Sequence, residues 1–537
     1  MNKITFKIFF AAFLIGNLSF VYGQCPVGDI ILVSQQQIDD FAINYPGCTE
    51  ILGQLKIEEN ISGNITNLNG LSQITSIDGH LDITNNSALN SLNGLNNLTT
   101  VGGDFYIWEN ASLTSLLGLD NLSSVNELNI TGNQSLINLM GLNNLTSVIF
   151  AINIVNNNVL NNLSSLSEIS TVRYLGISLN QALPNLIGLE GITEVSEYTS
   201  IWHNTNLTSL QGLNNLNFTK GVLIEDNDQL LNLSGLDNLT TVIDLNLLNN
   251  DNLADLGGVS NLNIIQGFLE IRDCQSITSL DGLENLTNLG TLELFANPNI
   301  LNINSLSNTT DIHAISIYNC TSLSSLSGIS HISQLSYFKL IHNFSLYNLN
   351  ALSNITSLGY LELSETTIND LTGLSNLISV DGYIELIFNP SLTNLAGLEN
   401  INPENITRFT ITGNQFLSSC AVISLCEYID LPGNLTEISG NKPGCNSIQE
   451  VEAACSLIGI EENQLSELNI YPNPTKGTFG ISGLKEGTIK IIDSQGRTVK
   501  ELISGEDVYS ISELSSGIYF VKITSEKSSI TKQLLKT

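Results

Sequence analysis

The chain has 537 residues, more than one compact core usually absorbs, so its length favours several domains or a repeat that extends in one dimension. Only 13% of the residues are charged and 42% are hydrophobic, which is not typical of a disordered chain. The formal net charge of −33 argues against nucleic acid and anionic membrane surfaces as partners, because phosphate binding needs clustered Lys and Arg.

The charge is distributed unevenly along the chain. Residues 24–466 contain 7 basic and 43 acidic residues, whereas the segment from Glu467 to the end contains 9 basic and 8 acidic residues. Together with a distinct N-terminal segment, this change in composition predicts a chain of three parts.

The segment 1–23 has the layout of a secretory signal peptide. Lys3 and Lys7 precede the apolar run from Ile8 to Ile15, and small or turn-favouring residues follow up to Gly23. This run is too short to span a bilayer, and no other stretch reaches the roughly 18 apolar residues that a membrane helix needs. We therefore expect segment 1–23 to be removed and the mature chain to be exported without a transmembrane segment.

The middle of the chain repeats a leucine-rich phrase. A hydrophobic mark, usually Leu, recurs from Leu71 to Leu398 at intervals of about 23 residues. Between the marks lies the pattern L-x-I-x-x-N-x-x-L-x-x-L, as at Leu81, Ile83 and Asn86. The L-x-I alternation predicts a short strand with Leu and Ile inward, and the Asn amide is expected to bond to backbone groups of adjacent coils. With the Ile as marker, sixteen such strands are expected from Ile57 to Ile411. Stacked coils would then bury one continuous core.

This pattern resembles the leucine-rich repeat and, in coil length and phrasing, bacterial surface leucine-rich proteins and the receptor L domain. The fold class expected is mainly β: a right-handed solenoid of about 16 coils with a long parallel sheet, disulfide caps and a small C-terminal β-sandwich. A coil this short leaves room for turns, 3₁₀ pieces and a second minor strand rather than a full helix. The expected boundaries are a signal peptide at 1–23, an N-terminal cap at 24–50, the solenoid at 51–417, a C-terminal cap at 418–456, a linker at 457–466 and the last domain at 467–537.

Six of the eight cysteines lie outside the repeats, where solenoid ends need caps. We expect Cys25 to pair with Cys48. Two further bridges are expected among the C-terminal cysteines, with the pairing left open: Cys420, Cys426, Cys445 and Cys455. Cys274 and Cys320 occupy the Asn position of their coils, two coils apart and beyond disulfide reach, so they are expected to be buried free thiols.

The segment from Glu467 to the end reads as a small all-β sandwich punctuated by Gly and Asn. Several spaced markers there resemble the C-terminal sorting domain of type IX secretion: Tyr471, Pro472, Asn473, Pro474, Gly477, Gly517, Tyr519, Val521 and Lys536. The resemblance implies that the type IX machinery is a partner, and that the protein crosses the outer membrane and is then cleaved. Whether the product is released or attached to the cell surface stays open.

No motif for catalysis stands out in the sequence. The five histidines are dispersed, and His203 and His342 lie six coils apart, so a shared metal is not expected. We therefore expect no enzymatic activity, no cofactor and no metal site. Acidic residues flank the expected outward face, where calcium binding and simple solvation are both open readings: Glu109, Glu225, Asp226, Glu270, Asp273, Glu293, Glu362, Glu365 and Glu385.

Aromatic residues gather on the same outward face. The position after each coil's Ile holds Trp108, Trp202, Phe295 and Tyr318, and Tyr106 lies one column over. Aromatic side chains on a rigid sheet are typical anchors for a partner, and the run from Leu248 to Ile341 predicts an exposed apolar stripe. The alternative is that strands favour aromatic residues by propensity alone.

The sequence therefore predicts an exported, cell-surface recognition or adhesion protein that binds a protein or a carbohydrate on its β face. The alternative function is a structural spacer or coat protein of the envelope without a specific ligand. Fold alone does not name a ligand or an oligomeric state.

Overall fold

The structure is a computed structural model that describes residues 25–466, 468–482, 484, 487–506, 508–524 and 529–537. The expected signal peptide lies outside the described residues. The chain divides into two compact units, one ending at Asn299 and the other beginning at Ile300. None of the described helices combines the length and the apolar character needed to cross a bilayer.

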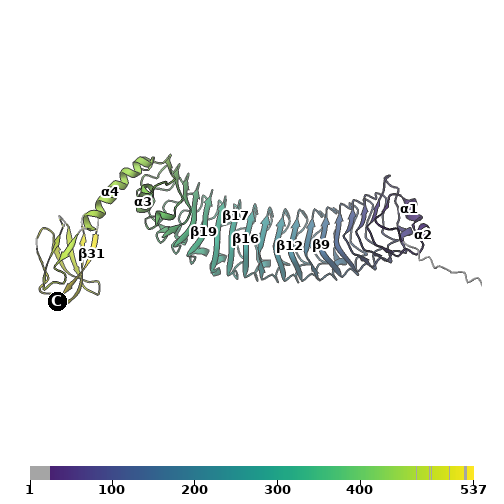
Figure 1. Cartoon of the computed structure of the whole chain (residues 1–537), viewed down its shortest axis with the longest axis horizontal. Helices are drawn as coiled ribbons and strands as arrows, with labels where there is room; N and C mark the ends of the chain where they lie inside the picture. Colours follow the sequence, from purple (N-terminus) through teal and green to yellow (C-terminus); the bar gives the residue numbers. More distant parts are fainter. Residues whose placement is uncertain (1–24, 467, 483, 485–486, 507, 525–528) are drawn as a thin grey trace, which may run out of the picture. The chain divides into compact units, whose positions relative to one another are not determined.

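The first unit is a stack of coils joined by a parallel ladder of strands (Figure 1). Each strand pairs with the equivalent strand of the next coil, so Leu81 lies opposite Phe105 and Leu128 lies opposite Ile152. The register therefore places equivalent residues in columns across the coils. The ladder strands are β1 (Ile30–Leu32), β3 (Leu55–Glu58), β5 (Leu81–Thr84), β7 (Phe105–Trp108), β8 (Ser124–Thr131), β9 (Ser147–Val155), β11 (Tyr174–Ser178), β12 (Glu194–Trp202), β13 (Phe218–Glu225), β15 (Asp244–Leu248), β16 (Ile264–Arg272) and β17 (Asn288–Phe295).

The rest of each coil is made of short pieces. Minor strands precede several main strands, and in β8, β9, β12, β13, β16 and β17 the two are continuous. The prediction of a second minor strand and of 3₁₀ turns in place of a full helix is confirmed. In this unit the separate pieces are β2 (Glu50–Ile51), β4 (Ser76–Ile77), β6 (Thr100–Val101), β10 (Thr171–Val172), β14 (Thr241–Val242), η1 (Asn69–Leu71), η2 (Ser164–Leu166) and η3 (Gly257–Val259).

The Leu and Ile positions of the repeat form the core. Leu81 and Ile83 are fully buried, and the Leu residues of the turns, such as Leu89 and Leu92, are buried as well. Each such side chain contributes about 1.5–3 kcal/mol relative to an exposed one. Because one coil cannot bury both sides of this layer, the coils are stable only as a stack.

A column of buried Asn side chains closes the turn after each main strand. The Nδ2 of Asn86 donates to the carbonyl of Ile57 at 2.9 Å, and its Oδ1 accepts from the backbone N–H of Glu59 at 3.1 Å. The residue before each Asn is left-handed, as at Glu109 with φ 55°. The predicted contacts between Asn amides and adjacent coils are confirmed along this unit at Asn86, Asn110, Asn133, Asn157, Asn180, Asn204, Asn227, Asn250 and Asn297.

Cys274 replaces Asn in this column and is a buried free thiol, as the sequence predicts. Its Sγ lies 3.5 Å from the carbonyl oxygen of Leu247 and 3.4 Å from that of Arg272, where an Asn would place its amide. Burial raises the pKa of this thiol to about 11. The thiol therefore stays protonated and serves as a weaker donor than the amide.

The N-terminal cap contains β1, α1 (Gln35–Asp39) and α2 (Phe41–Asn44). Strand β1 pairs in parallel with β3, so the cap itself supplies the first rung of the ladder. Ile38 and Phe41 are buried at the end of the core. A disulfide joins Cys25 to Cys48.

The second unit begins with the same kind of ladder: β18 (Asp311–Tyr318), β19 (Gln334–Ile341), β20 (Ser357–Ser364), β22 (Tyr383–Ile387), β23 (Arg408–Thr412) and β24 (Thr436–Ser439). Its connections contain β21 (Ser379–Val380), η4 (Asn304–Asn308), η5 (Ser327–Ile329), η6 (Asn350–Leu352), η7 (Thr372–Leu374) and η8 (Pro403–Asn405). Cys320, a second buried cysteine outside any disulfide as predicted, and Thr366 occupy Asn positions here. The sixteen strands expected from Ile57 to Ile411 correspond to the main strands from β3 to β23.

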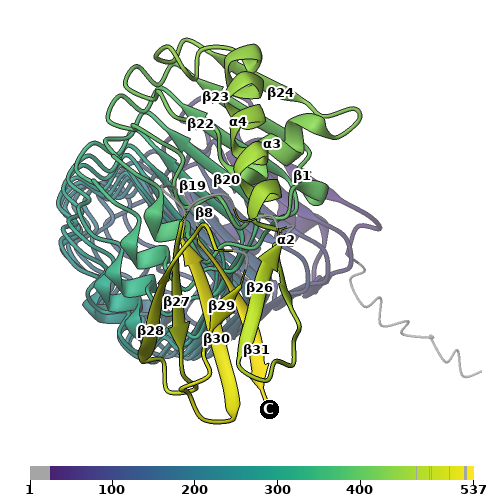
Figure 2. The ribbon, with the colours of Figure 1, turned by 90° about the vertical axis from the view of Figure 1, so that its left-hand side faces the viewer.

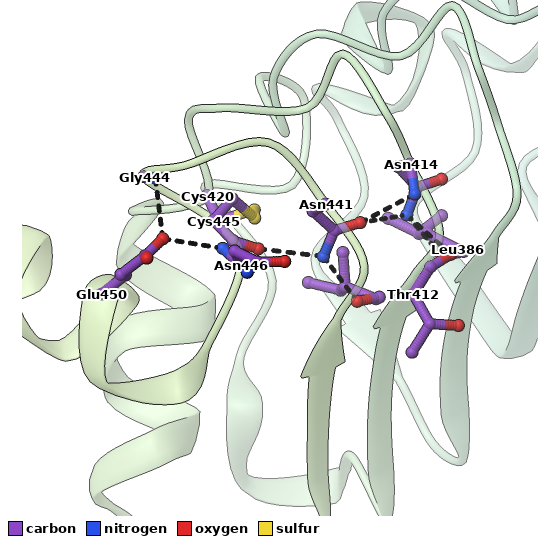
Figure 3. The surroundings of a disulfide bond; sticks show 10 residues. Leu386, Thr412, Asn414, Cys420, Asn441, Gly444, Cys445, Asn446 and Glu450 are labelled. Atoms are coloured by element: carbon purple, nitrogen blue, oxygen red, sulfur yellow. Dashed lines mark hydrogen bonds between the residues drawn. A yellow bond between two sulfur atoms is a disulfide. The ribbon is translucent and has the colours of Figure 1, made fainter.

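The C-terminal cap uses α3 (Ile423–Asp430), β24 and α4 (Ile448–Ser466), and α4 continues through the residues expected to form a linker. Disulfides join Cys420 to Cys445 and Cys426 to Cys455, which settles the pairing that the sequence leaves open. Asn441 ends the Asn column: its Oδ1 accepts from the backbone of Asn414 at 2.9 Å, and its Nδ2 donates to the Cys445 carbonyl at 2.9 Å (Figure 3).

The last domain is a small antiparallel sandwich, as predicted. One sheet contains β25 (Asn469–Tyr471), β26 (Thr478–Ser482) and β29 (Tyr509–Ser510). The other has the order β28 (Thr498–Ile503), β27 (Thr488–Ile492), β30 (Gly517–Thr524) and β31 (Ser529–Lys536). Figure 2 shows β27 beside β28, and Phe479, Ile491 and Val521 are buried in the core.

Candidate binding face

The outward residues that follow the inward Ile of each strand form one column, which we call the face column. In the first unit the register places Trp108 between Thr84 and Thr131, and Trp202 between Ser178 and Glu225. Equivalent residues of adjacent coils are thus direct neighbours.

The five aromatic residues expected to bind a ligand differ in exposure. Trp108 is 47% exposed, whereas Trp202, Phe295, Tyr318 and Tyr106 are half-buried. The hydroxyl of Tyr106 donates to the Asp104 carboxylate at 3.2 Å. Burial, together with that carboxylate, raises the pKa of Tyr106 to about 12. Among these five, Trp108 offers the largest accessible fraction of its ring to a partner.

The apolar stripe expected from Leu248 to Ile341 is not exposed. Leu248, Phe295 and Ile341 are half-buried, and the exposed member of the run within the first unit is the charged Arg272. Its guanidinium lies 4.7 Å from the centroid of the Phe295 ring. Arg272 also donates to Glu270 at 2.8 Å through Nε, so the cation is held over the ring and covers it.

Most of the few cations of the solenoid form ion pairs with carboxylates. Seven basic residues lie between residues 24 and 466, and six of them form ion pairs with carboxylates of the same or an adjacent coil. The pairs are Lys56 with Glu58, Arg173 and Lys220 with Glu197, Arg272 with Glu270, Lys339 with Glu362, and Arg408 with Glu385. The face therefore carries an internally paired network of charges and rings.

A ladder of stacked tyrosines in the second unit was not predicted from the sequence. Tyr337 and Tyr360 stack with ring centroids 4.9 Å apart, and Tyr360 and Tyr383 stack at 4.6 Å. Lys339 Nζ lies 5.2 Å from the Tyr360 ring centroid, and Arg408 lies 5.3 Å from that of Tyr383. Burial raises the pKa of the Tyr360 hydroxyl. These tyrosines recur once per coil, each directly before the first inward residue of the L-x-I pattern. That recurrence is the signal in the sequence that could have found the ladder.

A second feature missed from the sequence is the carboxylate of Glu59. It accepts from the Ser87 hydroxyl at 2.6 Å and from the backbone N–H groups of Gly63 at 2.8 Å and Ile65 at 3.0 Å. Burial opposes ionisation, but these hydrogen bonds outweigh it and lower the pKa of Glu59 to about 2. Glu59 thus organises the turn after β3.

The acidic residues of the face are dispersed in the part of the chain that the structure describes. No three His, Cys, Asp or Glu side chains there converge as a metal site would require. His203 is instead 2.7 Å from Asp226, and His342 is 3.2 Å from Glu365. These contacts join adjacent coils.

A shallow hollow of about 460 Å³ lies in the second unit, lined by Phe344, Glu365, Phe388, Pro390, Gly413 and Gln415. It borders the turn after Thr366, between Leu352 and Leu374, where the interval between hydrophobic marks of the repeat is shortest. Phe388 is 57% exposed and has left-handed backbone with φ 52°. The lining of the hollow is therefore partly aromatic and carries one carboxylate, that of Glu365.

The markers of the last domain come together although they are far apart in the sequence. Asn473 accepts from the backbone N–H of Leu535 at 2.9 Å and donates to the carbonyl of Gln533 at 2.6 Å. The buried Lys536 donates to the carbonyls of Ser512, at 3.0 Å, and Leu514. Tyr519 is buried. The marker residues near the start of the domain are exposed: Tyr471, Pro472, Asn473 and Pro474.

Two protein families match parts of the chain. Residues 469–537 match the secretion system C-terminal sorting domain, and residues 47–139 match the receptor L domain. No curated protein matches the chain. Both resemblances seen in the sequence are thereby confirmed, and the receptor L domain match contains Tyr106 and Trp108. The chain therefore combines a segment that matches the receptor L domain, residues 47–139, with a type IX secretion sorting domain at residues 469–537, which directs it out of the cell to the surface or the extracellular space.

Proposed function

We propose that this protein is a recognition or adhesion protein that binds a protein or a polysaccharide on the β face of its first coils, without catalysing a reaction. The observation that carries the proposal is Trp108. Trp108 is 47% exposed, and among the described residues no aromatic ring or cation is in contact with it. An exposed Trp on a rigid sheet offers large contact area at a low cost in conformational entropy.

The matching family supports the same location. Receptor L domain repeats span residues 47–139, and strands β5, β7 and β8 around Trp108 lie inside that range. Export by the sorting domain brings these coils into contact with molecules outside the cell.

The second candidate is a structural spacer or coat protein of the envelope. Its support is the paired network described above, because a face whose cations already contact their carboxylates and rings has little need of a ligand. Arg408 over Tyr383, at 5.3 Å, is an example.

The experiment that separates these functions is a binding screen of the mature exported protein against glycans and surface proteins. A matched pair of variants, Trp108→Ser and Trp202→Ser, is screened in parallel, since Trp202 is half-buried and lies against His203 at 5.2 Å between ring centroids. Recognition by the first coils predicts a ligand lost in Trp108→Ser and retained in Trp202→Ser. Absence of any ligand, with circular dichroism showing intact folds, favours the spacer.

A further inference from the structure

Two buried polar atoms stand out on strand β5. In the part of the chain that the structure describes, Asp82 Oδ1 and Thr84 Oγ1 are the buried side-chain polar atoms without a hydrogen-bond partner. Thr84 is only 6% exposed. Folded proteins pair nearly all such atoms, so two orphans on one strand call for an explanation.

Both orphans lie on the outward side of the sheet, next to aromatic residues. Asp82 pairs in register with Tyr106, and Thr84 with Trp108. The other carboxylate oxygen of Asp82 accepts from Gln54 Nε2 at 2.5 Å, so the side chain is held in place with one oxygen left over. Burial raises the pKa of Asp82, which agrees with a carboxyl group short of solvent and partners.

The indole of Trp108 has small neighbours on both sides. Thr84 precedes it in the face column and Thr131 follows it. Gly132, which has no side chain, also lies beside the indole: a Cβ at this position would be 3.6 Å from the indole Cδ1. Trp108 is therefore a ring platform beside one carboxylate oxygen and one hydroxyl that lack partners.

These groups match the chemistry of a sugar. A pyranose ring has an apolar C–H face that packs on an indole, and hydroxyls that donate to a carboxylate and exchange hydrogen bonds with a threonine. The surrounding charge selects among sugars: residues 24–466 carry 43 acidic and 7 basic residues, which repels uronic and sulfated sugars.

We propose that strands β5 and β7 form a subsite for a neutral pyranose sugar, which stacks on Trp108 and pairs its hydroxyls with Asp82 and Thr84. The subsite rests on the proposed recognition function and names its ligand class. Because neither orphan atom touches solvent, a neighbouring side chain moves when the sugar binds. Trp108 is the in-register neighbour of Thr84, whereas Tyr106 is tied to Asp104, so we expect the Trp108 side chain to move when the sugar binds.

The chain offers its own reporter for this motion. It contains two tryptophans, so the Trp202→Phe variant of the full mature protein leaves Trp108 as the single fluorophore. We would titrate this variant with neutral oligosaccharides of glucose, mannose, galactose and N-acetylglucosamine, following its fluorescence and, in parallel, the heat of binding. A saturable change in both signals is expected for at least one of them.

The decisive variants are Thr84→Val and Asp82→Asn in the same background. Each should weaken oligosaccharide binding at least tenfold, because a site built around hydroxyls loses strongly when one partner is removed. Thr84→Val removes a hydroxyl that has no partner, so the thermal unfolding midpoint of this variant should not fall below that of the parent protein. Thr131→Val is the matched control on the other side of the indole and should change the affinity less than twofold.

The negative outcomes are distinct. Oligosaccharide binding that survives both Thr84→Val and Asp82→Asn overturns the subsite and leaves recognition standing. A protein ligand lost in Trp108→Ser, with no response to any neutral sugar, also overturns the sugar subsite alone. If neither sugars nor surface proteins bind, both the subsite and the proposed function are overturned.

Discussion

Replacing one Asn of the buried column tests the physical account of the solenoid most directly. Asn157 is fully buried in the first unit. Its Nδ2 donates to the Ile130 carbonyl at 2.9 Å and to the Val155 carbonyl at 3.1 Å, and its Oδ1 accepts from the backbone N–H of Asn133 at 3.0 Å. One side chain thus ties its own coil to the coil before it.

Asn157→Ala should lower the free energy of unfolding by about 2–6 kcal/mol, because it leaves two buried backbone groups without the partner, at about 1–3 kcal/mol each. The two groups are the N–H of Asn133 and the carbonyl of Ile130. Asn157→Cys is the matched control, because Cys274 occupies the same position naturally with its Sγ 3.5 Å from the Leu247 carbonyl. A thiol is a weaker partner than an amide, so we expect Cys to cost about half as much as Ala.

The assay is urea unfolding followed by far-UV circular dichroism, with hydrogen exchange at the Asn133 amide as a local probe. The order of midpoints should be wild type, then Asn157→Cys, then Asn157→Ala, and exchange at Asn133 should be fastest in the Ala variant. If Ala and wild type unfold at the same urea concentration, or if Cys costs as much as Ala, the buried amide contacts do not stabilise the stack as argued.

Three further predictions concern residues at other sites. Because the folded pKa of Glu59 is lowered to about 2, its contribution is present above the unfolded value near 4.5 and lost as pH falls toward 2. Glu59→Gln should therefore cost about 1–2 kcal/mol at pH 7, and the gap should close in acid-unfolding curves; a gap that persists at pH 2 contradicts this. Tyr360→Leu should cost about 1–2 kcal/mol through lost stacking, measured by thermal unfolding, whereas the matched exposed Tyr347→Leu should be neutral. Lys536→Met should leave two carbonyls without their donor and make the sorting domain cleave faster in limited proteolysis, while Lys532→Met should not; equal cleavage rates would count against a structural role for Lys536.

The repeat could be predicted from the sequence because its determinants are local. The alternation of Leu81, Asp82 and Ile83 decides which side chains point inward, and the Asn three residues after the Ile marks the turn. The same reasoning placed Cys274 in the Asn column as a free thiol. The sorting domain could be located for the same reason, since each group of markers, such as Tyr471 to Gly477, is a short local signal, although the groups meet only in the folded domain.

Tertiary structure alone decided how exposed the outward residues are. Trp108 and Trp202 occupy identical phases of the repeat, yet Trp108 has Thr84 and Thr131 beside it and is exposed. Trp202 lies between Ser178 and Glu225, against a His203 ring that contacts Asp226 of the next coil at 2.7 Å, and it is half-buried. Exposure depends on the rotamers and sizes of residues one full coil away in the neighbouring coils, which no local pattern encodes. The same holds for the pairing of Cys420 with Cys445 and for the orphan hydroxyl of Thr84, because both depend on which atoms meet after the coils have stacked.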